Sequence, residues 1–377
     1  MKLKDLHTDC RVFNGYKPCA PSKVCLDCND YDSPKSRVLL IHLGALGAVL
    51  RSTALLPVIR KKYPDCKLTW LTEKSARPLL AHNPMIDQIL DFDAGSIQAV
   101  LAQKFDVVIN LEKAIQACAV AQQTQAKTKL GFGLNETGAI VPLNKGAQRL
   151  YLLGLDDQLK FFKNTCTENE AVCELLEAPY ERDEYILNFT HEEKKFVANY
   201  KRQVGIKQGD FVIGFNTGCS NLFSLKKLPV DQQVELIKKL QKEFPKGKFV
   251  LLGGREDTER NQEIETALNG TVINTPSSEG LRRGILYEDI CDLIVTGDTL
   301  GLHIAIALKK KTVVWFGLSC ANEIELYDRG KKVLSPVPCR PCWKKTCDFE
   351  VLCNEVVDLD EMVKAVQEVV AHEVSHI

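Results

Sequence analysis

Short apolar runs that alternate with amphipathic helical patterns dominate the sequence from residue 37 onward. The stretch "RVLLIHLGALGAVLRSTALLPVIRKKYP" reads as a buried strand, a glycine turn and a helix over 47–62 that stops before Pro64. The runs "KLTWLT", "FDVVINL" and "TKLGFGL" are expected to be further strands, with helices at 75–82 and 113–124. Because parallel neighbours need helical crossovers, this pattern predicts a parallel sheet.

The same pattern starts again after a helix that we expect over 191–203. The runs "DFVIGFN", "KFVLLGG" and "KTVVWFG" are expected to be strands, and 230–244 has apolar residues close to helical spacing. Two such halves are typical of a pair of Rossmann-like domains that face each other across a cleft. The predicted fold class is therefore α/β with parallel sheets, divided into an irregular segment at 1–36, a domain at 37–190 and a domain at 191–355.

Composition excludes several classes of function. The net charge of the 377 residues is zero, so there is no global electrostatic argument for binding nucleic acid. No apolar run approaches the length of a membrane span, and the start "MKLKDLHTDC" is too polar for a signal peptide. We therefore expect a cytoplasmic protein.

Fifteen cysteines are many for a reducing compartment, where disulfides are rare and clustered thiols more often bind metal. Two groups of four stand out, spaced C-x8-C-x5-C-x2-C near the start and C-x2-C-x4-C-x5-C near the end. Four thiolates suit structural Zn²⁺, which is favoured here, and also suit a [4Fe–4S] cluster. Free thiols or labile disulfides are the alternative. The eight predicted metal ligands are Cys10, Cys19, Cys25, Cys28, Cys339, Cys342, Cys347 and Cys353.

Three loops of the second half have the small residues and charges that suit a phosphate or a sugar. The turn Asn216–Ser220 and Lys226 follow one strand, and two glycines end the strand "KFVLLGG". In "TGDTLGLHIAIAL" an aspartate and a threonine open a helix, which makes a second anion site at the same edge of the sheet. Each feature has a plainer interpretation: an ordinary loop, a helix cap, and a core histidine at 303.

Taken together, these pieces resemble glycosyltransferase family 9, the bacterial ADP-heptose:lipopolysaccharide heptosyltransferases. The matching stretches begin "RVLLIHLGALGAVL", "FNTGCSNLFSLKKLP", "LLGGREDTER" and "VTGDTLGLHIAIAL", and they span roughly residues 37–355. The resemblance implies a GT-B fold and inverting, metal-independent transfer of heptose from ADP-heptose to a lipopolysaccharide core sugar. It also implies that a final helix, 356–377, crosses back to the first domain, which could bring the two cysteine groups close together.

The resemblance further implies which residues meet the donor. Thr217 and Gly218 would face the pyrophosphate, Lys226 a phosphate or the sugar, Glu256 the nucleoside, and Asp298 the sugar hydroxyls. The predicted substrate-binding set is Gly44, Gly47, Asn216, Thr217, Gly218, Lys226, Gly253, Gly254, Glu256, Asp298, Thr299, Leu300, Gly301 and His303.

The chain departs from the family pattern where the general base is expected. The family loop Leu-Gly-Asp-Val reads "LGAV" here, so Ala48 replaces the acid that would take the proton of the acceptor hydroxyl. Glu112 and His42 are the predicted replacements, Lys226 completes the predicted catalytic set, and Asp9 and Asp27 are weaker candidates. Glu112 could equally be a first-turn acid of a helix.

The main hypothesis is a glycosyltransferase that works at the inner face of the inner membrane on a lipid-linked glycan. The basic and apolar stretch around residues 149–163 would meet the acceptor or the bilayer, unless it is only a solvated face. Two alternatives stay open: a relative that binds a nucleotide sugar without turnover, because of Ala48, and an iron–sulfur redox protein. An engineered origin of Ala48 is also open.

Overall fold

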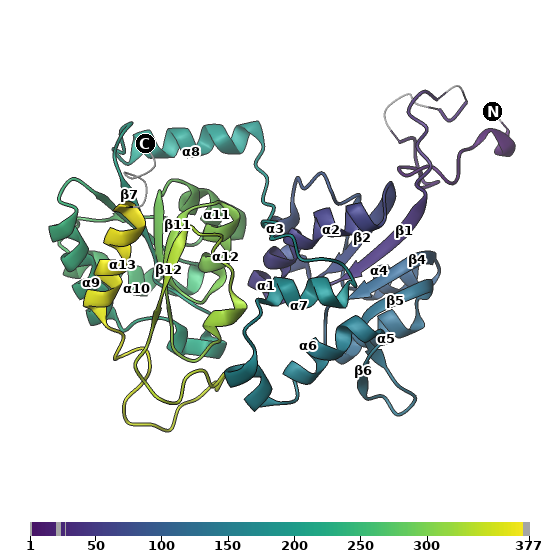
Figure 1. The fold of residues 1–377 in the computed structure, drawn as a ribbon. Coiled ribbons are helices and arrows are strands. Elements are labelled where there is room, and N and C mark those ends of the chain that lie inside the picture. The colour runs from purple at the N-terminus through teal and green to yellow at the C-terminus, as the bar shows by residue number, and fades with distance from the viewer. Residues whose placement is uncertain (1, 20–23, 27, 372–377) are drawn as a thin grey trace.

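Two six-stranded sheets, each covered by helices, form the two halves of the computed structural model (Figure 1). It describes residues 2–19, 24–26 and 28–371. The strand orders are β3-β2-β1-β4-β5-β6 in the first sheet and β12-β11-β10-β7-β8-β9 in the second. The expected repetition of an α/β domain with a parallel sheet is confirmed, with one exception: β6 runs antiparallel to β5.

The first domain follows the predicted alternation closely. Its strands are β1 (Ser36–Ile41), β2 (Cys66–Thr72), β3 (Gln88–Asp91), β4 (Lys104–Asn110), β5 (Gln125–Leu134) and β6 (Ile140–Pro142). The helix predicted over 47–62 consists of α1 (Leu46–Arg51), the 3₁₀ turn η2 (Ser52–Ala54) and α2 (Leu55–Lys62). The other helices are η3 (Lys74–Ala76), α3 (Arg77–Leu80), α4 (Ala94–Leu101), α5 (Ile115–Gln123), η4 (Lys145–Ala147), α6 (Gln148–Leu153), η5 (Leu159–Lys163) and α7 (Glu168–Leu175).

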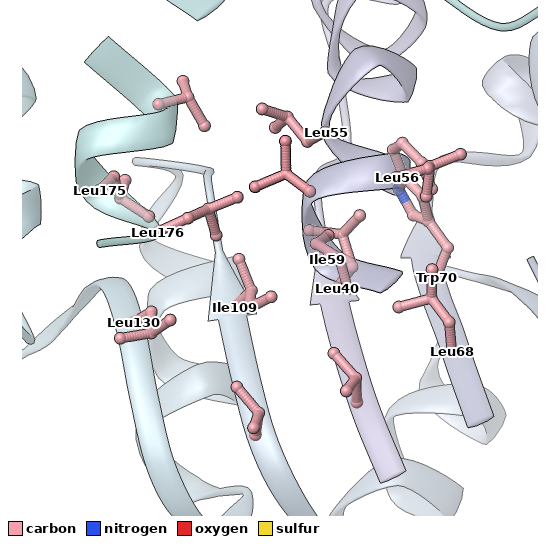
Figure 2. Close-up of a cluster of buried hydrophobic side chains, with 14 of the residues drawn as sticks. Leu40, Leu55, Leu56, Ile59, Leu68, Trp70, Ile109, Leu130, Leu175 and Leu176 are labelled. Atoms are coloured by element: carbon pink, nitrogen blue, oxygen red, sulfur yellow. The ribbon is translucent and has the colours of Figure 1, made fainter. Parts of the chain in front are cut away.

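The core of this domain lies between the sheet and the helices on one of its faces. Leu40 of β1, Trp70 of β2 and Ile109 of β4 point toward Ile59 of α2 and Leu176 after α7, and all are nearly inaccessible to solvent (Figure 2). Burying each such side chain contributes about 1.5–3 kcal/mol to folding. Leu39 and Ile41 of β1 belong to a second buried cluster with Val120 of α5, so the apolar runs are buried on both sides, as in other parallel sheets.

The second domain repeats this architecture around β7–β12. Its strands are β7 (Val212–Asn216), β8 (Lys248–Leu252), β9 (Ile273–Asn274), β10 (Leu293–Gly297), β11 (Lys311–Phe316) and β12 (Gly330–Leu334). Its helices are α8 (His191–Gln203), η6 (Asn221–Lys226), α9 (Val230–Glu243), η7 (Arg255–Asp257), α10 (Thr258–Ala267), α11 (Leu281–Asp289), α12 (Leu300–Ala307), η8 (Ala321–Glu323) and α13 (Leu359–Ala371).

The last helix does not return to the first domain, so that prediction is wrong for the part of α13 that the structure describes. Its buried residues Met362, Val366 and Val369 share one core with Val313 and Trp315 of β11. The apolar face of α13 packs against the second sheet and against α9. This face is therefore not available to pack on the first domain. Among the described helices none is both long and apolar enough to span a bilayer.

The two domains meet where α1 packs on α12. A side-chain carbon added at Gly47 of α1 would lie 2.3 Å from Cδ2 of His303 in α12, so only glycine permits this approach. Around it, Leu50 of α1 shares a buried cluster with Leu302 and Ile304 of α12. Because α1 and α12 each follow the carboxyl end of a strand, the contact brings the two strand-end regions together.

Arg282 of α11 joins three segments at the back of this contact. Its guanidinium donates two hydrogen bonds to the carboxylate of Glu193 in α8, at 2.7 and 2.8 Å, and another to the carbonyl of Pro78 in the first domain at 3.0 Å. The Arg282 hydrogen bonds lower the pKa of Glu193 to about 2, against the opposing effect of burial. A depressed carboxyl pKa stabilises the fold above the unfolded value and loses that effect as the pH falls toward 2.

We therefore expect Arg282→Ala to lower the free energy of unfolding by about 2 kcal/mol at pH 7, because a charged hydrogen-bonded group loses its partner. The deficit should shrink at pH 3, where Glu193 begins to protonate. Urea unfolding at the two pH values measures both. The matched control is Arg283→Ala, which removes a half-exposed neighbour. Equal losses for the two variants would contradict this role of Arg282.

Candidate functional site

The carboxyl ends of β7 and β10 bring four of the predicted donor residues into direct contact. The amide of Asn216, at the end of β7, donates to the hydroxyl of Thr299 at 2.6 Å and to Thr296 at 3.1 Å. Gly301 lies so close that a side-chain carbon there would be 2.5 Å from the Asn216 side chain. Leu300, between them, begins α12 and packs in the interdomain cluster. The amino end of α12 is thereby fixed at the sheet edge.

A buried ion pair lies beside this helix start. Lys226 Nζ is 2.8 Å from Oδ2 of Asp298, and their side chains are only 13% and 9% exposed. Burial would raise the pKa of Asp298, but the Lys226 ammonium holds it below its ordinary value. Gly297 lets the Lys226 loop approach, because a side-chain carbon there would lie 2.1 Å from the Lys226 carbonyl oxygen. Asp298 thus stays ionised beside the ammonium.

In the neighbouring loops, Thr217, Gly218 and Glu256 make contacts other than those predicted for them. The amide and hydroxyl of Thr217 both donate to the Leu252 carbonyl, so this side chain holds the loop together. Gly218 makes room for the carboxylate of Asp257, which would lie 1.9 Å from an added carbon, and Asp257 accepts a bond from Gly254. Glu256, the predicted nucleoside contact, is exposed.

Asp257 is a residue that sequence reasoning missed, although it follows Glu256 directly. It is buried, and its Oδ1 has no hydrogen-bond partner among the described residues. Burial raises its pKa above the ordinary value. Gly253 lies against its side chain, so this carboxyl is the polar group around which the glycines of the loop are arranged.

On the first domain, Glu112 lies at the glycine loop that leads into α1. Its Oε2 accepts weak bonds from the amides of Leu43 and Gly44, at 3.3 and 3.4 Å, and Oε1 accepts from Lys113 at 3.1 Å. A side-chain carbon at Gly44 would meet no described heavy atom within 4 Å. Glu112 is therefore a partly exposed carboxylate just after the end of β4, held by the backbone of the glycine loop.

His42 is placed differently. Its ring is buried, with Nδ1 2.8 Å from the Ser52 hydroxyl, which in turn donates to the Ala48 carbonyl at 2.9 Å. Because that hydroxyl proton is used, His42 donates through Nδ1. Burial lowers the pKa of His42 to about 3, and the nearby Arg51 charge adds to the effect. These bonds favour a structural role that joins the end of β1 to α1 and η2.

His303 also lies inside the protein, between the domains. Its Nδ1 is 3.4 Å from the Tyr185 hydroxyl, and the two rings are nearly parallel at 6.0 Å. Burial and the Arg51 guanidinium lower the pKa of His303 to about 3, so the ring is neutral. This geometry agrees best with the plainer interpretation of the sequence, in which His303 is a histidine of the protein core.

Four charged residues that sequence reasoning missed surround the same place. Arg51, at the end of α1, is 3.0 Å from Glu168 of α7, and Lys160 of η5 is 3.6 Å from Glu323 of η8. These residues come from four elements and both domains. Each carries a local signal, because Glu168 and Glu323 are acids in the first turn of a helix and Arg51 and Lys160 are bases in the last turn of one. Their pairing across the domains can be recognised only once the domains are assembled.

The second group of cysteines gathers around one small cavity. Cys339, Cys342, Cys347 and Cys353 line about 20 Å³ together with Leu225 and Gly317. Burial and then the three other thiols raise the pKa of Cys353 to about 11. Among the described residues no three His, Cys, Asp or Glu side chains are arranged as a metal site, so the thiols are gathered but not in a coordination geometry. All fifteen cysteines are free thiols.

The first group lies at the opposite edge of the first sheet. Arg11, next to Cys10, bonds to Asp65 at 2.8 Å, to the Cys66 carbonyl at 2.6 Å and to Asp87 at 3.2 Å, all at the amino ends of β2 and β3. The two cysteine groups therefore lie at opposite ends of the molecule, which corrects the expectation that they come close (Figure 1).

The N-terminal segment also contains Asp9 and Asp27, the two weaker candidates for the general base. Asp9 accepts bonds from Tyr31 and Ser33 at 2.6 and 3.0 Å, at the edge remote from Glu112, so it cannot serve as the base there. Asp27 lies outside the described residues. Cys10 is buried, Cys19 is exposed, and Cys25 and Cys28 are partly exposed.

Known proteins resemble both domains. The relative lipopolysaccharide heptosyltransferase 1 of Campylobacter coli is 21% identical over 357 residues, which cover 89% of this chain and 100% of that protein. The glycosyl transferase family 9 structure from Veillonella parvula DSM 2008 has a TM-score of 0.70 at 17% identity, over 90% of this chain and 99% of that chain. The iron-containing dodecameric glycosyltransferase TibC of enterotoxigenic E. coli H10407 has a TM-score of 0.51 at 12% identity, over 90% and 77%.

The family model of glycosyltransferase family 9 (heptosyltransferase) matches residues 95–352, well over half of the chain. The match runs from α4 of the first domain to the second cysteine group, and so it includes Glu112, the buried ion pair and the helix start at α12. The chain therefore belongs to glycosyltransferase family 9, the heptosyltransferase family, and its two domains have the GT-B fold.

Proposed function

We propose that this protein is an inverting glycosyltransferase that transfers heptose, or a related sugar, from ADP-heptose to a lipopolysaccharide core or another envelope glycan. The observation that carries the proposal is the buried Lys226–Asp298 pair beside the start of α12. The family supports the reaction class. The donor is supported by TibC, whose structure was solved in complex with ADP-D-beta-D-heptose.

The reaction is a displacement at the anomeric carbon. The acceptor oxygen forms the new bond while the bond to the diphosphate oxygen breaks, and the electron pair leaves with ADP. The proton of the acceptor hydroxyl passes to a base. The leaving diphosphate gains negative charge, which the Lys226 ammonium and the first amides of α12 are placed to stabilise. Asp298 orients Lys226, and the family resemblance assigns it to the sugar hydroxyls of the donor.

We assign the base to Glu112, which compensates for Ala48. Its carboxylate accepts only the backbone bonds described above and lies beside the open space at Gly44. The rival carboxylates, Glu168 and Glu323, are each held by a cation of the interdomain cluster. Glu112 is preferred because it lies beside the open space at Gly44, where an acceptor can approach, whereas the rivals lie within the interdomain cluster.

Glu112→Gln should lower kcat by about 10²–10⁴-fold, because general-base catalysis contributes that much, with a donor KM close to that of wild type. Asp298→Asn should instead weaken donor binding as well. Release of ADP from ADP-heptose, with and without lipopolysaccharide acceptor, measures both. The control is Glu136→Gln, which neutralises an exposed carboxylate in the β5–β6 turn.

Wild-type protein that binds ADP but never releases it from ADP-heptose would favour the binding relative without turnover. Full activity of Glu112→Gln would remove Glu112 from the mechanism and leave Glu168 and Glu323 as candidates. Reversible one-electron chemistry without any transfer would favour the redox alternative.

Glu323 allows a test of the interdomain cluster by pH. Burial, and then the charge of Glu168, raise its pKa to about 7, against the opposing effects of Lys160 and Arg51; Asp298 adds to the rise. A raised carboxyl pKa means that the folded state loses stability as the pH rises from the unfolded value of about 4.5 through about 7. The full loss is roughly 3 kcal/mol.

Glu323→Gln should therefore match wild type in thermal stability near pH 4.5 and exceed it increasingly up to pH 8. Differential scanning calorimetry across this range, with Glu136→Gln as the control, measures the difference. A difference that does not vary with pH would show that Glu323 titrates normally in the folded protein.

We also propose that the four thiols of residues 339–353 hold one structural metal ion. Four sulfur ligands around one cavity suit tetrahedral Zn²⁺ or iron. The description of TibC as iron-containing supports iron, while the ligand chemistry alone favours zinc. Glycosyl transfer does not use this ion. The N-terminal cysteines remain predicted as a second, separate site.

Elemental analysis of anaerobically purified protein should give about one equivalent of zinc or iron that is lost in the Cys342→Ser/Cys347→Ser variant. A second equivalent that disappears in Cys19→Ser/Cys25→Ser would establish the N-terminal site. Iron with acid-labile sulfide would mean a cluster, and metal-free wild type would exclude both sites.

For the acceptor we propose a lipid-linked glycan met by a cytoplasmic, peripherally bound protein. Leu152, Leu155 and Phe162 are exposed along α6 and η5, in the stretch that the sequence marked as basic and apolar. Arg149 of this stretch bonds to Asn164 and Cys166, and Lys160 points into the interdomain cluster, so the apolar side chains carry the argument for a lipid surface.

A further inference from the structure

Trp343 lies between the second and third cysteines of the loop 339–353, yet its ring belongs to the donor site. The Lys226 ammonium is 4.4 Å from the ring centroid, within the range of a cation–π interaction. Phe223 of η6 packs edge-on against the same ring at 5.7 Å. The indole N–H donates to the Cys320 sulfur at 3.4 Å. Lys226 is thus held between the carboxylate of Asp298 and an aromatic face.

The backbone of the loop fixes where this ring lies. The amides of Cys342 and Trp343 both donate to the Leu318 carbonyl, at 2.9 and 2.8 Å. Trp343 has a φ of 53°, a left-handed conformation that is uncommon for a bulky residue. Tertiary contacts of this kind are what maintains such a conformation.

The loop that carries Lys226 is packed against the cysteines as well. Leu225 lines the cavity of the four thiols, and the carbonyl of Lys227 accepts a bond from Asn354 at 2.9 Å. On the far side, Cys353 fits against Gly317, where an added carbon would lie 2.7 Å from its sulfur. The residues on both sides of Lys226 therefore contact the thiol loop or the residue that follows it.

We propose that Trp343 is a positioning residue of the donor site, and that the thiol loop holds its ring over the Lys226 ammonium. The proposal rests on the proposed function in one respect, because it takes the ligand of Lys226 to be the diphosphate of a nucleotide sugar. The role of the Trp343 ring is to keep the Lys226 ammonium partly desolvated and directed toward that diphosphate. The ring also meets Lys160 of the first domain at 5.0 Å, which places it at the domain boundary.

The full-length protein can be tested with ADP alone as the probe. The affinity of Trp343→Leu for ADP should fall about tenfold by calorimetry, and that of Trp343→Phe less than threefold, since a phenyl ring restores the aromatic face. In a Lys226→Met background, Trp343→Leu should cause no further loss. An additive loss there, or wild-type affinity in Trp343→Leu, would overturn the role of the ring.

Fluorescence gives a readout that does not depend on ligand binding. The chain has two other tryptophans, Trp70 and Trp315, and both are buried in the sheet cores. Lys226→Met should therefore change the emission of Trp343, measured as the difference from the matching Trp343→Phe protein, even if wild type does not bind ADP. Failure to bind ADP would count against the proposed function, while unchanged emission would count against the contact itself.

Cys347→Ser tests whether the thiol loop holds the ring, because it leaves the tryptophan in place. The ADP affinity should fall as in Trp343→Leu, with the midpoint of global unfolding within a few degrees of wild type. Wild-type affinity of Cys347→Ser would separate the ring from the thiols and overturn that half of the proposal.

Discussion

The contact of Gly47 with His303 is the constraint on which the geometry between the domains depends. Each domain has its own core, and each sheet ends in loops that have no fixed relation to the other until α1 packs on α12. The absence of a side chain at one residue allows the helices to approach closely. Under the proposed function, Glu112 and the Lys226–Asp298 pair, which belong to different domains, would act as parts of one site because of this packing.

This packing partly buries several charged side chains at the domain boundary, which costs solvation energy. Arg51, Glu168, Lys160 and Glu323 are withdrawn from most solvent as the domains close, and each charge is partly compensated by the next. Two buried histidines in the same region stay neutral, so they do not add charge near the cations. The result is a region largely shielded from solvent, in which the charge of Lys226 would act strongly on an anion.

The sequence was sufficient for what depends on local pattern. All strands except β6 and β12, the helix at 191–203 and the strand-end positions of Asn216, Glu112 and Asp298 follow from periodicity and from the rule that parallel strands end at one edge. The strand β12 was not predicted, because its five residues are mostly accessible to solvent and form no apolar run. The antiparallel β6, the packing of α13 and the cluster around Arg51 depend on contacts between distant residues. Trp343 is the clearest case, because in sequence it is only a residue between two cysteines.

Arg11 has a consequence for how the chain acquires its structure. Its acceptors at Asp65, Cys66 and Asp87 lie more than fifty residues downstream, at the start of β2 and β3. During synthesis the N-terminal segment therefore leaves the ribosome well before its docking site exists. The thiols of this segment are therefore made before the strands against which Arg11 docks, so they can meet oxidants and stray metal ions until β2 and β3 have been synthesised.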